Sequence, residues 1–335
     1  MSEMEPQFVF ALTNPGSENA LKLEVVAKNL PWQASYQRKG FVTFKVVNES
    51  ETSPQNLLEQ PLACALRFCI SLGRTKSRDE ATALIKSNPA YLGGPIHFLR
   101  TINGWGEREA EAVPESPRLD ECVGTILQLA ENEFWAGLHW HRPFLSPDPG
   151  GESILKMPTD SPSRAWLKLE EAVRFFDLSF SAKDVVVELG CAPGGVVLAL
   201  LKRGVSVIGV DPAAMAEAIS GATVMERPSA SQARPWFYHC RKPAALTSKR
   251  DLGADVSWFM SDMNQTPEVV LAECGRFCKM APSIRKVLIT LKLADLARVA
   301  EQAQWHEALA ALGFKSTRLQ QFSVHHKEFA LLATK

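Results

Sequence analysis

The sequence has no long apolar run, and this absence excludes one broad class of protein. No stretch of about 18 consecutive apolar residues occurs in the 335 residues, so a membrane-spanning helix is not expected. The first six residues, Met-Ser-Glu-Met-Glu-Pro, supply neither the basic start nor the apolar middle of a secretion signal. With 46% hydrophobic and 22% charged residues, the composition is that of a soluble globular protein.

Paired cysteine motifs are also missing. Seven cysteines are scattered through the chain, and no two of them form a C-x-x-C pair. That absence argues against a structural zinc site, and the apolar or helical surroundings favour buried, reduced thiols. We therefore expect no metal and a cytoplasmic location. The cysteines are Cys64, Cys69, Cys122, Cys191, Cys240, Cys274 and Cys278.

The net charge is zero, which argues against a protein that coats nucleic acid through bulk electrostatics. Residues 1–145 hold 14 basic and 17 acidic side chains, and the remainder holds 23 and 20. Basic clusters in the second part either form solvated faces or contact a phosphate backbone. They comprise Arg234, Arg241, Lys242, Lys249 and Arg250, and then Lys279, Arg285 and Lys286.

The length of the chain exceeds one ordinary hydrophobic core and predicts two domains. Five prolines and two adjacent glycines fall within residues 143–163, a composition typical of a linker or a long connecting loop. We therefore expect an N-terminal α+β domain over residues 1–145, a linker over 146–163 and a second domain over 164–335.

The N-terminal part mixes strand and helix patterns. Residues 8–12 and 41–47 predict strands, and Asn14-Pro-Gly-Ser17 predicts a turn that begins an amphipathic helix. Residues 125–130 and 134–140 flank Glu-Asn-Glu as the arms of a hairpin. His139 and His141 occupy alternate positions along and just after the second arm. Because no third ligand is near, we expect a solvent-facing or interface strand rather than a metal site.

From residue 184 onward, strand and helix patterns alternate. Strands are predicted over 184–190, 205–211, 256–262, 286–293, 314–321 and 328–334, and helices over 267–280 and 295–312. This alternation predicts a Rossmann-like, doubly wound parallel α/β sheet. The last two strands leave no room for a crossover helix, so they should pair as an antiparallel hairpin. Such an ending is typical of a methyltransferase sheet rather than of a dehydrogenase.

A glycine-rich turn after the first of these strands predicts a nucleotide-binding site. The strand from Asp184 to Glu188 leads into Gly190-Cys-Ala-Pro-Gly-Gly195, and a helix pattern follows directly. Glycine lets the backbone approach a ligand without a Cβ in the way. Asp211, about 20 residues past the first strand, is placed to accept hydrogen bonds from a ribose diol. The predicted cofactor-binding residues are Glu188, Gly190, Cys191, Ala192, Pro193, Gly194, Gly195, Asp211 and Asp262.

Polar residues at the ends of other strands are candidates for chemistry. Lys292 lies in an apolar strand pattern, where a buried amine costs several kcal/mol unless it is paired or used. It is either a lysine that snorkels at a strand end or a proton acceptor whose pKa is lowered by burial or by a second cation. Asp262 either caps a turn or orients a lysine or the cationic end of a cofactor. Lys168, in an amphipathic helix pattern, is on its own typical of a surface lysine.

The order of the motifs over residues 160–335 resembles the FtsJ-like RNA ribose 2′-O-methyltransferases. The resemblance implies S-adenosylmethionine as the cofactor and a catalytic set of Lys168, Asp262, Lys292 and Glu328. The motifs are Ser163-Arg-x-x-x-Lys-Leu-x-Glu171, Glu188-Leu-Gly-Cys-Ala-Pro-Gly-Gly195, Ser261-Asp-Met, Leu291-Lys-Leu and a glutamate, Glu328, that opens the last strand.

Residues 162–172 are most similar to the RlmM-type bacterial members, which methylate a cytidine ribose in large-subunit (23S) ribosomal RNA. This similarity implies an RNA partner, rRNA or a precursor particle, and a THUMP-like RNA-binding domain at the N-terminus. It also implies an aspartate near the cofactor adenine after the third strand. This chain has Tyr238-His-Cys-Arg-Lys242 there, with no acid.

The implied reaction is attack of a ribose 2′ oxygen on the cofactor methyl group. Lys292 would be the base, Lys168 a second cation that lowers its pKa, and Asp262 and Glu328 the groups that position them. Three alternatives remain open: transfer or messenger RNA as the target, a non-catalytic RNA-binding protein on the same fold, and a nicotinamide-dependent dehydrogenase. The last predicts a G-x-G-x-x-G turn, and the turn from Gly190 to Gly195 differs from it in spacing and by its proline.

Overall fold

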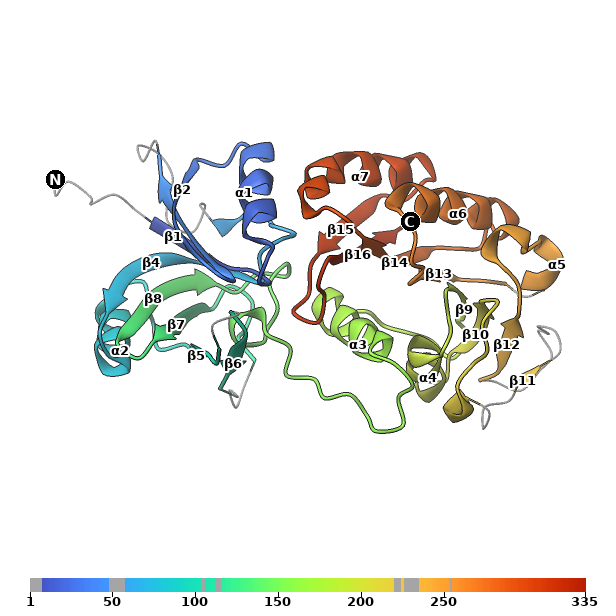
Figure 1. Ribbon diagram of the computed structural model, residues 1–335, viewed down its shortest axis with the longest axis horizontal. Helices are drawn as coiled ribbons and strands as arrows, with labels where there is room; N and C mark the ends of the chain where they lie inside the picture. The colour runs from blue at the N-terminus through green and yellow to red at the C-terminus, as the bar shows by residue number, and fades with distance from the viewer. Residues whose placement is uncertain are drawn as a thin grey trace. The chain divides into compact units, whose positions relative to one another are not determined.

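Two eight-stranded sheets organise the chain (Figure 1). The computed structural model describes residues 8–47, 58–103, 106–111, 116–219, 224–225, 235–253 and 255–335, so Arg234 of the predicted basic cluster lies outside the described residues. Each sheet belongs to its own unit. The first unit contains residues 1–154, 296–300 and 320–326, and the second contains residues 155–295, 301–319 and 327–335.

The sheet of the first unit is mainly antiparallel, with the order β2-β3-β1-β4-β8-β7-β5-β6 and with β5 parallel to β7. The strands predicted over 8–12 and 41–47 are confirmed, and so is the predicted hairpin, which β7 and β8 form. The strands are β1 (Phe8–Leu12), β2 (Trp32–Arg38), β3 (Phe41–Val46), β4 (Arg67–Thr75), β5 (Ile96–Thr101), β6 (Arg108–Ala110), β7 (Cys122–Ala130) and β8 (Glu133–Trp140).

Contacts of Arg108 show that this sheet curls. Arg108 lies on edge strand β6, yet it donates from Nη1 to the carbonyl of Gly40 at 2.8 Å and from Nη2 to that of Thr13 at 2.9 Å, beside β3 and β1. Its Nε pairs with Glu152 at 2.5 Å. The curled sheet encloses an apolar cluster, because alternate residues of neighbouring strands point to the same face. The cluster consists of the buried side chains Phe10, Leu12, Phe41, Cys69, Leu99 and Leu127.

A buried polar cluster in the same sheet corrects the exposure expected for His139. His139 of β8 is fully buried, and Arg67 of β4 donates to its Nε2 at 2.7 Å. Because Arg67 supplies a hydrogen bond to Nε2 inside the sheet, the histidine can be buried with that nitrogen satisfied. Arg67 is also fully buried, and its Nη2 donates to the carbonyls of Ser146 at 2.5 Å and Asp148 at 2.9 Å. The chain over 148–151, within the predicted linker, is therefore buried in the first unit.

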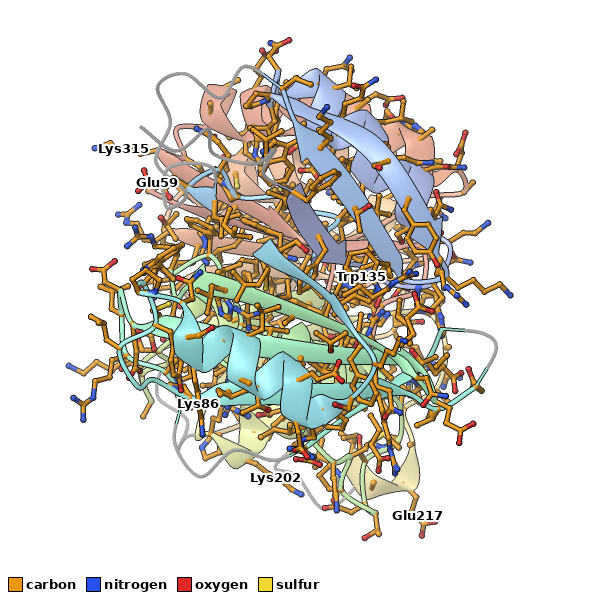
Figure 2. All side chains as sticks on the ribbon, turned by 90° about the vertical axis from the view of Figure 1, so that its left-hand side faces the viewer. Glu59, Lys86, Trp135, Lys202, Glu217 and Lys315 are labelled. Carbon is orange, nitrogen blue, oxygen red and sulfur yellow. The ribbon has the colours of Figure 1, made fainter. Side chains whose placement is uncertain are left out.

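Two helices accompany this sheet: α1 (Glu18–Ala27) and α2 (Arg78–Ser87). The hydroxyl of Ser77 caps α2 by accepting from the backbone amide of Glu80, and acidic side chains in the first turn complement the helix dipole. Helix α2 packs on β4, β7 and β8, across which Figure 2 shows it running. In α1 the Glu18 carboxylate accepts from the amides of Gly16 and Gly40, which joins the helix start to the β2–β3 turn.

The sheet of the second unit has the order β11-β12-β10-β9-β13-β14-β16-β15. Strands β9, β10, β12, β13 and β14 run parallel, whereas β16 is antiparallel to β14. The predicted Rossmann-like sheet with an antiparallel last strand is confirmed. Its strands are β9 (Val185–Leu189), β10 (Ser206–Val210), β11 (Val224–Met225), β12 (Phe237–Cys240), β13 (Trp258–Ser261), β14 (Lys286–Lys292), β15 (Ser316–Gln320) and β16 (Glu328–Thr334).

In the second unit α3 precedes β9, and the other helices alternate with the strands along the chain (Figure 1). The helix predicted over 267–280 has those bounds, with Pro267 at its first turn, where a missing amide hydrogen costs nothing. The segment predicted as one helix over 295–312 begins instead with a 3-10 stretch, Leu296–Glu301. The α-helices are α3 (Ala165–Phe176), α4 (Gly195–Lys202), α5 (Lys249–Leu252), α6 (Pro267–Met280) and α7 (Gln302–Ala311).

The described residues contain neither a membrane-spanning helix nor a cluster of metal ligands. No described helix is long and apolar enough to span a bilayer. No group of three or more His, Cys, Asp or Glu side chains within those residues is placed to hold a metal ion. All seven cysteines are free thiols, six of them buried and Cys278 half-buried, as the sequence predicted.

Candidate active site

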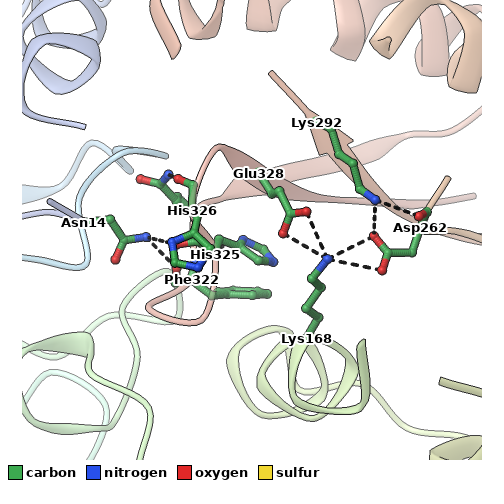
Figure 3. Close-up of polar contacts among 9 residues, drawn as sticks. Asn14, Lys168, Asp262, Lys292, Phe322, His325, His326 and Glu328 are labelled. Atoms are coloured by element: carbon green, nitrogen blue, oxygen red, sulfur yellow. Dashed lines mark hydrogen bonds and ion pairs between the residues drawn. The ribbon is translucent and has the colours of Figure 1, made fainter. Parts of the chain in front are cut away.

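Four charged side chains from separate segments of the second unit meet at the carboxyl edge of its sheet (Figure 3). Lys168 comes from the first turn of α3, and Asp262 directly follows β13. Lys292 is the last residue of β14, and Glu328 is the first residue of β16. Because β14 and β16 are antiparallel, the end of one lies opposite the start of the other, and Lys292 pairs in register with Glu328.

Lys168 lies at the centre of this group. Its Nζ is 3.1 Å and 3.2 Å from the two carboxylate oxygens of Asp262, and 2.9 Å from Oε2 of Glu328. A lysine amine between two carboxylates can donate hydrogen bonds to both of them. The side chain that is typical of a surface lysine in sequence therefore has two acidic partners.

Lys292 has a weaker set of partners. Its Nζ donates to the backbone carbonyl of Asp262 at 2.9 Å and lies 3.4 Å from Oδ1 of the same residue. It therefore shares one carboxylate with Lys168, whereas Lys168 has two.

All four side chains are partly accessible. The exposed fractions are 17% for Lys168, 16% for Asp262, 23% for Lys292 and 19% for Glu328. Such exposure is low enough to strengthen the electrostatic interactions relative to bulk water, and it leaves the amines open to an incoming polar group. The arrangement can hold a hydroxyl group and remove its proton.

The glycine-rich turn begins at the end of β9, one strand away from Asp262. Gly190 has a φ of 78° and its amide donates to the carbonyl of Val210 at 2.9 Å. A Cβ on Gly190 would lie 3.0 Å from the backbone of Met263, so the turn and the chain after β13 approach closely only because this residue is glycine. Cys191 is buried, with its Sγ 3.7 Å from the sulfur of Met215, and the Pro193 carbonyl accepts from Ala216.

The last two glycines of the turn start α4. Gly194 precedes the helix with a φ of 115°, and Gly195 is its first residue. A Cβ on Gly195 would lie 2.9 Å from the backbone nitrogen of Trp166 in α3, so this glycine permits α3 to pack directly on the turn. Lys168 follows Trp166 by two residues, so the packing that shapes the turn also fixes the helix that carries the central lysine.

Asp211, directly after β10, shapes the turn through both carboxylate oxygens. Its Oδ2 accepts from the amide of Ala192 at 3.1 Å and its Oδ1 from that of Ala213 at 2.8 Å. His239 of β12 lies 3.0 Å through Nε2 from the backbone carbonyl of Asp211, a contact that the sequence patterns did not suggest. Each carboxylate oxygen has a second lone pair, so Asp211 can still accept from a ligand hydroxyl.

Glu188 is the most unusual acid of the site. Its side chain is buried in β9, and its Oε2 has no hydrogen-bond partner among the described residues. Burial, together with the nearby charges of Asp262 and Asp211, raises the pKa of Glu188 well above its ordinary value. A buried, unpartnered carboxyl group beside two other acids fits a ligand that brings positive charge.

These residues fit S-adenosylmethionine, which carries a sulfonium and an ammonium group. The fit rests on the unpartnered oxygen of Glu188 and on the acids Asp211 and Asp262 at the neighbouring strand ends. No acid occurs after β12, as the sequence indicated. Instead Lys242 there pairs with Asp251 of α5 at 2.7 Å.

Comparison with known proteins addresses the same half of the chain. Residues 162–305 match the family described as FtsJ-like methyltransferase. This part of the chain is similar to the FtsJ-like methyltransferases. The matched residues include Lys168, Asp262 and Lys292, and Glu328 lies beyond them. The family resemblance predicted from the sequence is thereby confirmed.

Several curated relatives carry the same name, ribosomal RNA large subunit methyltransferase M. The protein of Shewanella sediminis is 29% identical over 188 residues, which cover 54% of this chain and 48% of that protein. That of Teredinibacter turnerae is 30% identical, with 56% and 51% covered. That of Laribacter hongkongensis is 34% identical, with 44% and 39% covered. The matched part of the chain thus spans about half the length of these relatives or less.

The structure brings together the four predicted catalytic residues and places the predicted cofactor-binding residues on the adjoining turn and strand ends. Their roles stay predictions, and so do the THUMP-like character and the RNA-binding role of residues 1–145. Two contacts, His239 with Asp211 and Lys242 with Asp251, were not predicted. A histidine and a lysine directly at a strand end were the signals available in the sequence.

Proposed function

We propose that this protein is an S-adenosylmethionine-dependent RNA ribose 2′-O-methyltransferase that acts on a cytidine of large-subunit ribosomal RNA. The observation that carries the proposal is the cluster of two lysines and two carboxylates beside the glycine turn. The similarity to the FtsJ-like methyltransferases and the relatives named for large-subunit ribosomal RNA support the substrate class.

The cofactor would be held by the turn from Glu188 to Gly195 and by Asp211 and Asp262. When bound, the cofactor supplies a methyl group on a cationic sulfur, and the sulfur departs as a neutral thioether. Glu188 and Asp262 would face its positive charge. Asp211 would accept from the ribose of the cofactor.

The proton of the ribose 2′ hydroxyl is the chemical obstacle, because a neutral hydroxyl is a poor nucleophile. In its free-amine form, Lys292 takes this proton on Nζ as the oxygen attacks. Lys168, which lies between Asp262 and Glu328, donates to the same oxygen. Asp262 orients both lysines, so the oxygen can be held in line with the methyl group.

Replacement of the proposed base tests this assignment. Lys292→Ala is expected to lower kcat by about 10²- to 10⁴-fold, because the general base is lost, with cofactor affinity unchanged in calorimetry. Lys286→Ala is the matched control, since Lys286 begins the same strand, packs over Trp258 and is far from the carboxyl edge. A Lys292→Ala protein with full activity would overturn the role of Lys292.

The target is tested separately from the chemistry. Ribose methylation is mapped across ribosomal RNA from cells with the protein, without it, and with the Lys292→Ala form. The expected result is one cytidine of the large-subunit RNA whose 2′-O-methyl group requires the active protein. If the dependent methyl group lies in transfer or messenger RNA, that RNA is the substrate instead. If the protein binds RNA but no methyl group depends on it, the protein is not a methyltransferase.

A further inference from the structure

The sheet of the second unit separates the two basic clusters that the sequence contains in its second half. Arg241 follows β12 directly, at the edge where the parallel strands end and where Asp211 follows β10. Lys286 is the first residue of β14 and therefore lies at the opposite edge. Because a strand rises about 3.3 Å per residue, the seven residues of β14 place Lys286 about 20 Å from Lys292. Only the first cluster thus lies on the side of the proposed active site.

Helix α5 adds two exposed cations beside the end of β12. Nζ of Lys242 pairs with Oδ1 of Asp251 at 2.7 Å, which ties α5 to the residue that follows Arg241. Lys249 and Arg250 lie just before Asp251 in α5, and both are exposed, as is Arg241. Arg241, Lys249 and Arg250 together form a basic patch at this end of the sheet.

Within the described residues, no acid pairs with the basic patch. The two cations of α5 make no hydrogen bond or ion pair there, and Arg241 reaches only the carbonyl of Pro212, at 3.4 Å. The acid of the same segment, Asp251, is already paired with Lys242, and it also accepts from the amide of Ser248 at 2.8 Å. The positive charge of the patch therefore remains available to an anionic partner.

A residue of α6 fixes the segment that carries the patch. Nη1 of Arg276 donates to the carbonyl of Thr247 at 2.7 Å, and Nη2 donates to that of Ala244 at 2.5 Å. Glu273 pairs with the same guanidinium group at 2.6 Å, so this acid is also occupied. A segment that is ordered before a ligand arrives loses less conformational entropy when the ligand binds.

We propose that the basic patch contacts phosphate groups of the substrate RNA outside the nucleotide that is methylated. The proposal rests on the proposed function, because it takes RNA as the substrate. Neighbouring strands lie about 4.8 Å apart and three spacings separate β12 from β13, so the patch is about 14 Å from the strand end that Asp262 follows. It is therefore too far away to touch the reacting ribose, whereas an RNA backbone presents negative charge along its whole length.

The salt dependence of RNA binding tests this contact. A variant with Arg241→Ala, Lys249→Ala and Arg250→Ala loses three phosphate contacts, each of which contributes about 0.7 to the slope of log affinity against log salt for a single strand. We expect the slope, measured by filter binding with deproteinised large-subunit ribosomal RNA, to become less steep by about 2. Between roughly 50 and 200 mM salt, the RNA affinity of the unchanged protein should fall about 20-fold more than that of the variant.

Steady-state kinetics separate this role from catalysis. The three changes should raise KM for RNA and leave kcat at saturating RNA unchanged, because a contact outside the reacting nucleotide binds substrate and transition state equally. The calorimetric affinity for S-adenosylmethionine should also stay the same. A lower kcat with an unchanged KM would overturn the proposal.

Three exposed cations at the opposite edge supply the matched control. Lys279 lies in the last turn of α6, Arg285 directly precedes β14, and the amide of Lys315 donates to the carbonyl of Thr334 at the end of β16. A variant with all three changed to alanine should keep the slope of the unchanged protein. Equal losses of slope in the two triple variants would mean that bulk charge explains binding, and would overturn the proposal. An unchanged slope in the patch variant would do the same.

The outcomes also distinguish the basic patch from the proposed function. If the patch variant keeps its slope while ribosomal RNA is methylated, the patch has no role in RNA binding and the methyltransferase remains. If the full chain neither binds nor methylates RNA, the proposed function fails first. If polyglutamate displaces the RNA as strongly as unlabelled RNA does, the patch binds acidic protein rather than phosphate groups.

Discussion

Both sheets of the molecule carry charged or titratable side chains, but they place them differently. In the first unit Arg67, His97 and His139 are fully buried in the body of the sheet. In the second unit Lys168 and Lys292 are about one-fifth exposed at the carboxyl edge. The comparison shows that burial and strand direction, rather than residue type, separate groups that hold a fold together from groups that are available for chemistry.

Strand direction explains the difference. The parallel strands β9, β10, β13 and β14 all end at one edge, so residues that follow them meet although they are far apart in sequence. In the mainly antiparallel first sheet, strand ends alternate between edges, so Arg67 at the start of β4 meets His139 near the end of β8. Both are buried, and Arg67 serves as a permanent partner of His139 because water does not reach it.

The largest effect that tests this contrast is on stability. Arg67→Met should lower the free energy of unfolding by about 3 kcal/mol, because His139 and the carbonyls of Ser146 and Asp148 lose their donor. Urea denaturation measures the loss. Arg74→Met is the matched control, since Arg74 lies on the same strand and is exposed, and it should change little. Equal effects of the two changes would contradict the comparison.

Each buried histidine taken singly should have a smaller effect, which appears on acidification. Burial, with the charge of Arg67 next, lowers the pKa of His97 to about 3 and that of His139 well below its ordinary value. Burial also lowers the pKa of His141 to about 4; Arg67 lowers it further and Glu121 raises it. Below about pH 6.5 these histidines bind protons in the unfolded chain but not in the folded chain. The stability that is present above that pH is therefore lost as the pH falls.

For each fully shifted histidine the loss approaches about 1.4 kcal/mol per pH unit below pH 6.5. Urea denaturation between roughly pH 7.5 and pH 5 measures it. His97→Phe should reduce the slope. A slope that is unchanged in His97→Phe would show that this ring does not titrate on unfolding.

The smallest effect has the opposite direction and concerns the second unit. Because the pKa of Glu188 is raised in the folded protein, its contribution to stability is present below its unfolded pKa and is lost as the pH rises through the folded value. Glu188→Gln should therefore make the stability of the second unit less sensitive to rising pH, and urea titrations of both forms compare the slopes. Identical slopes would mean that Glu188 ionises as freely as an exposed acid.

Much of the second sheet could be predicted because its strands are buried on both faces and therefore form continuous apolar runs. Lys292 stood out as a charged residue within such a run, and the glycine turn was visible for the same local reason. Lys168 and Glu328 have no such local signal. Only the family resemblance named them, since their partners lie 94 or more residues away in the chain.

The first unit was harder to predict for a physical reason. Alternation along β8 suggested an exposed or interface histidine, but the partner of His139 is Arg67, which is 72 residues away, and no local pattern contains that pair. The curl of the sheet, visible in the bonds of Arg108, also buries positions that a flat two-faced strand would expose. Six of seven residues of β2 are exposed, so that strand carries no apolar pattern.

The origin of the first unit in three separate chain segments has a consequence for biosynthesis. A ribosome releases residues 1–154 long before residues 320–326, so Asn14, Ala63 and Ala65 have their carbonyl and amide partners only after that later segment is synthesised. The nascent protein therefore completes the first unit and adds Glu328 to the second at almost the same moment of synthesis. A product that stops short of that stretch would lack both.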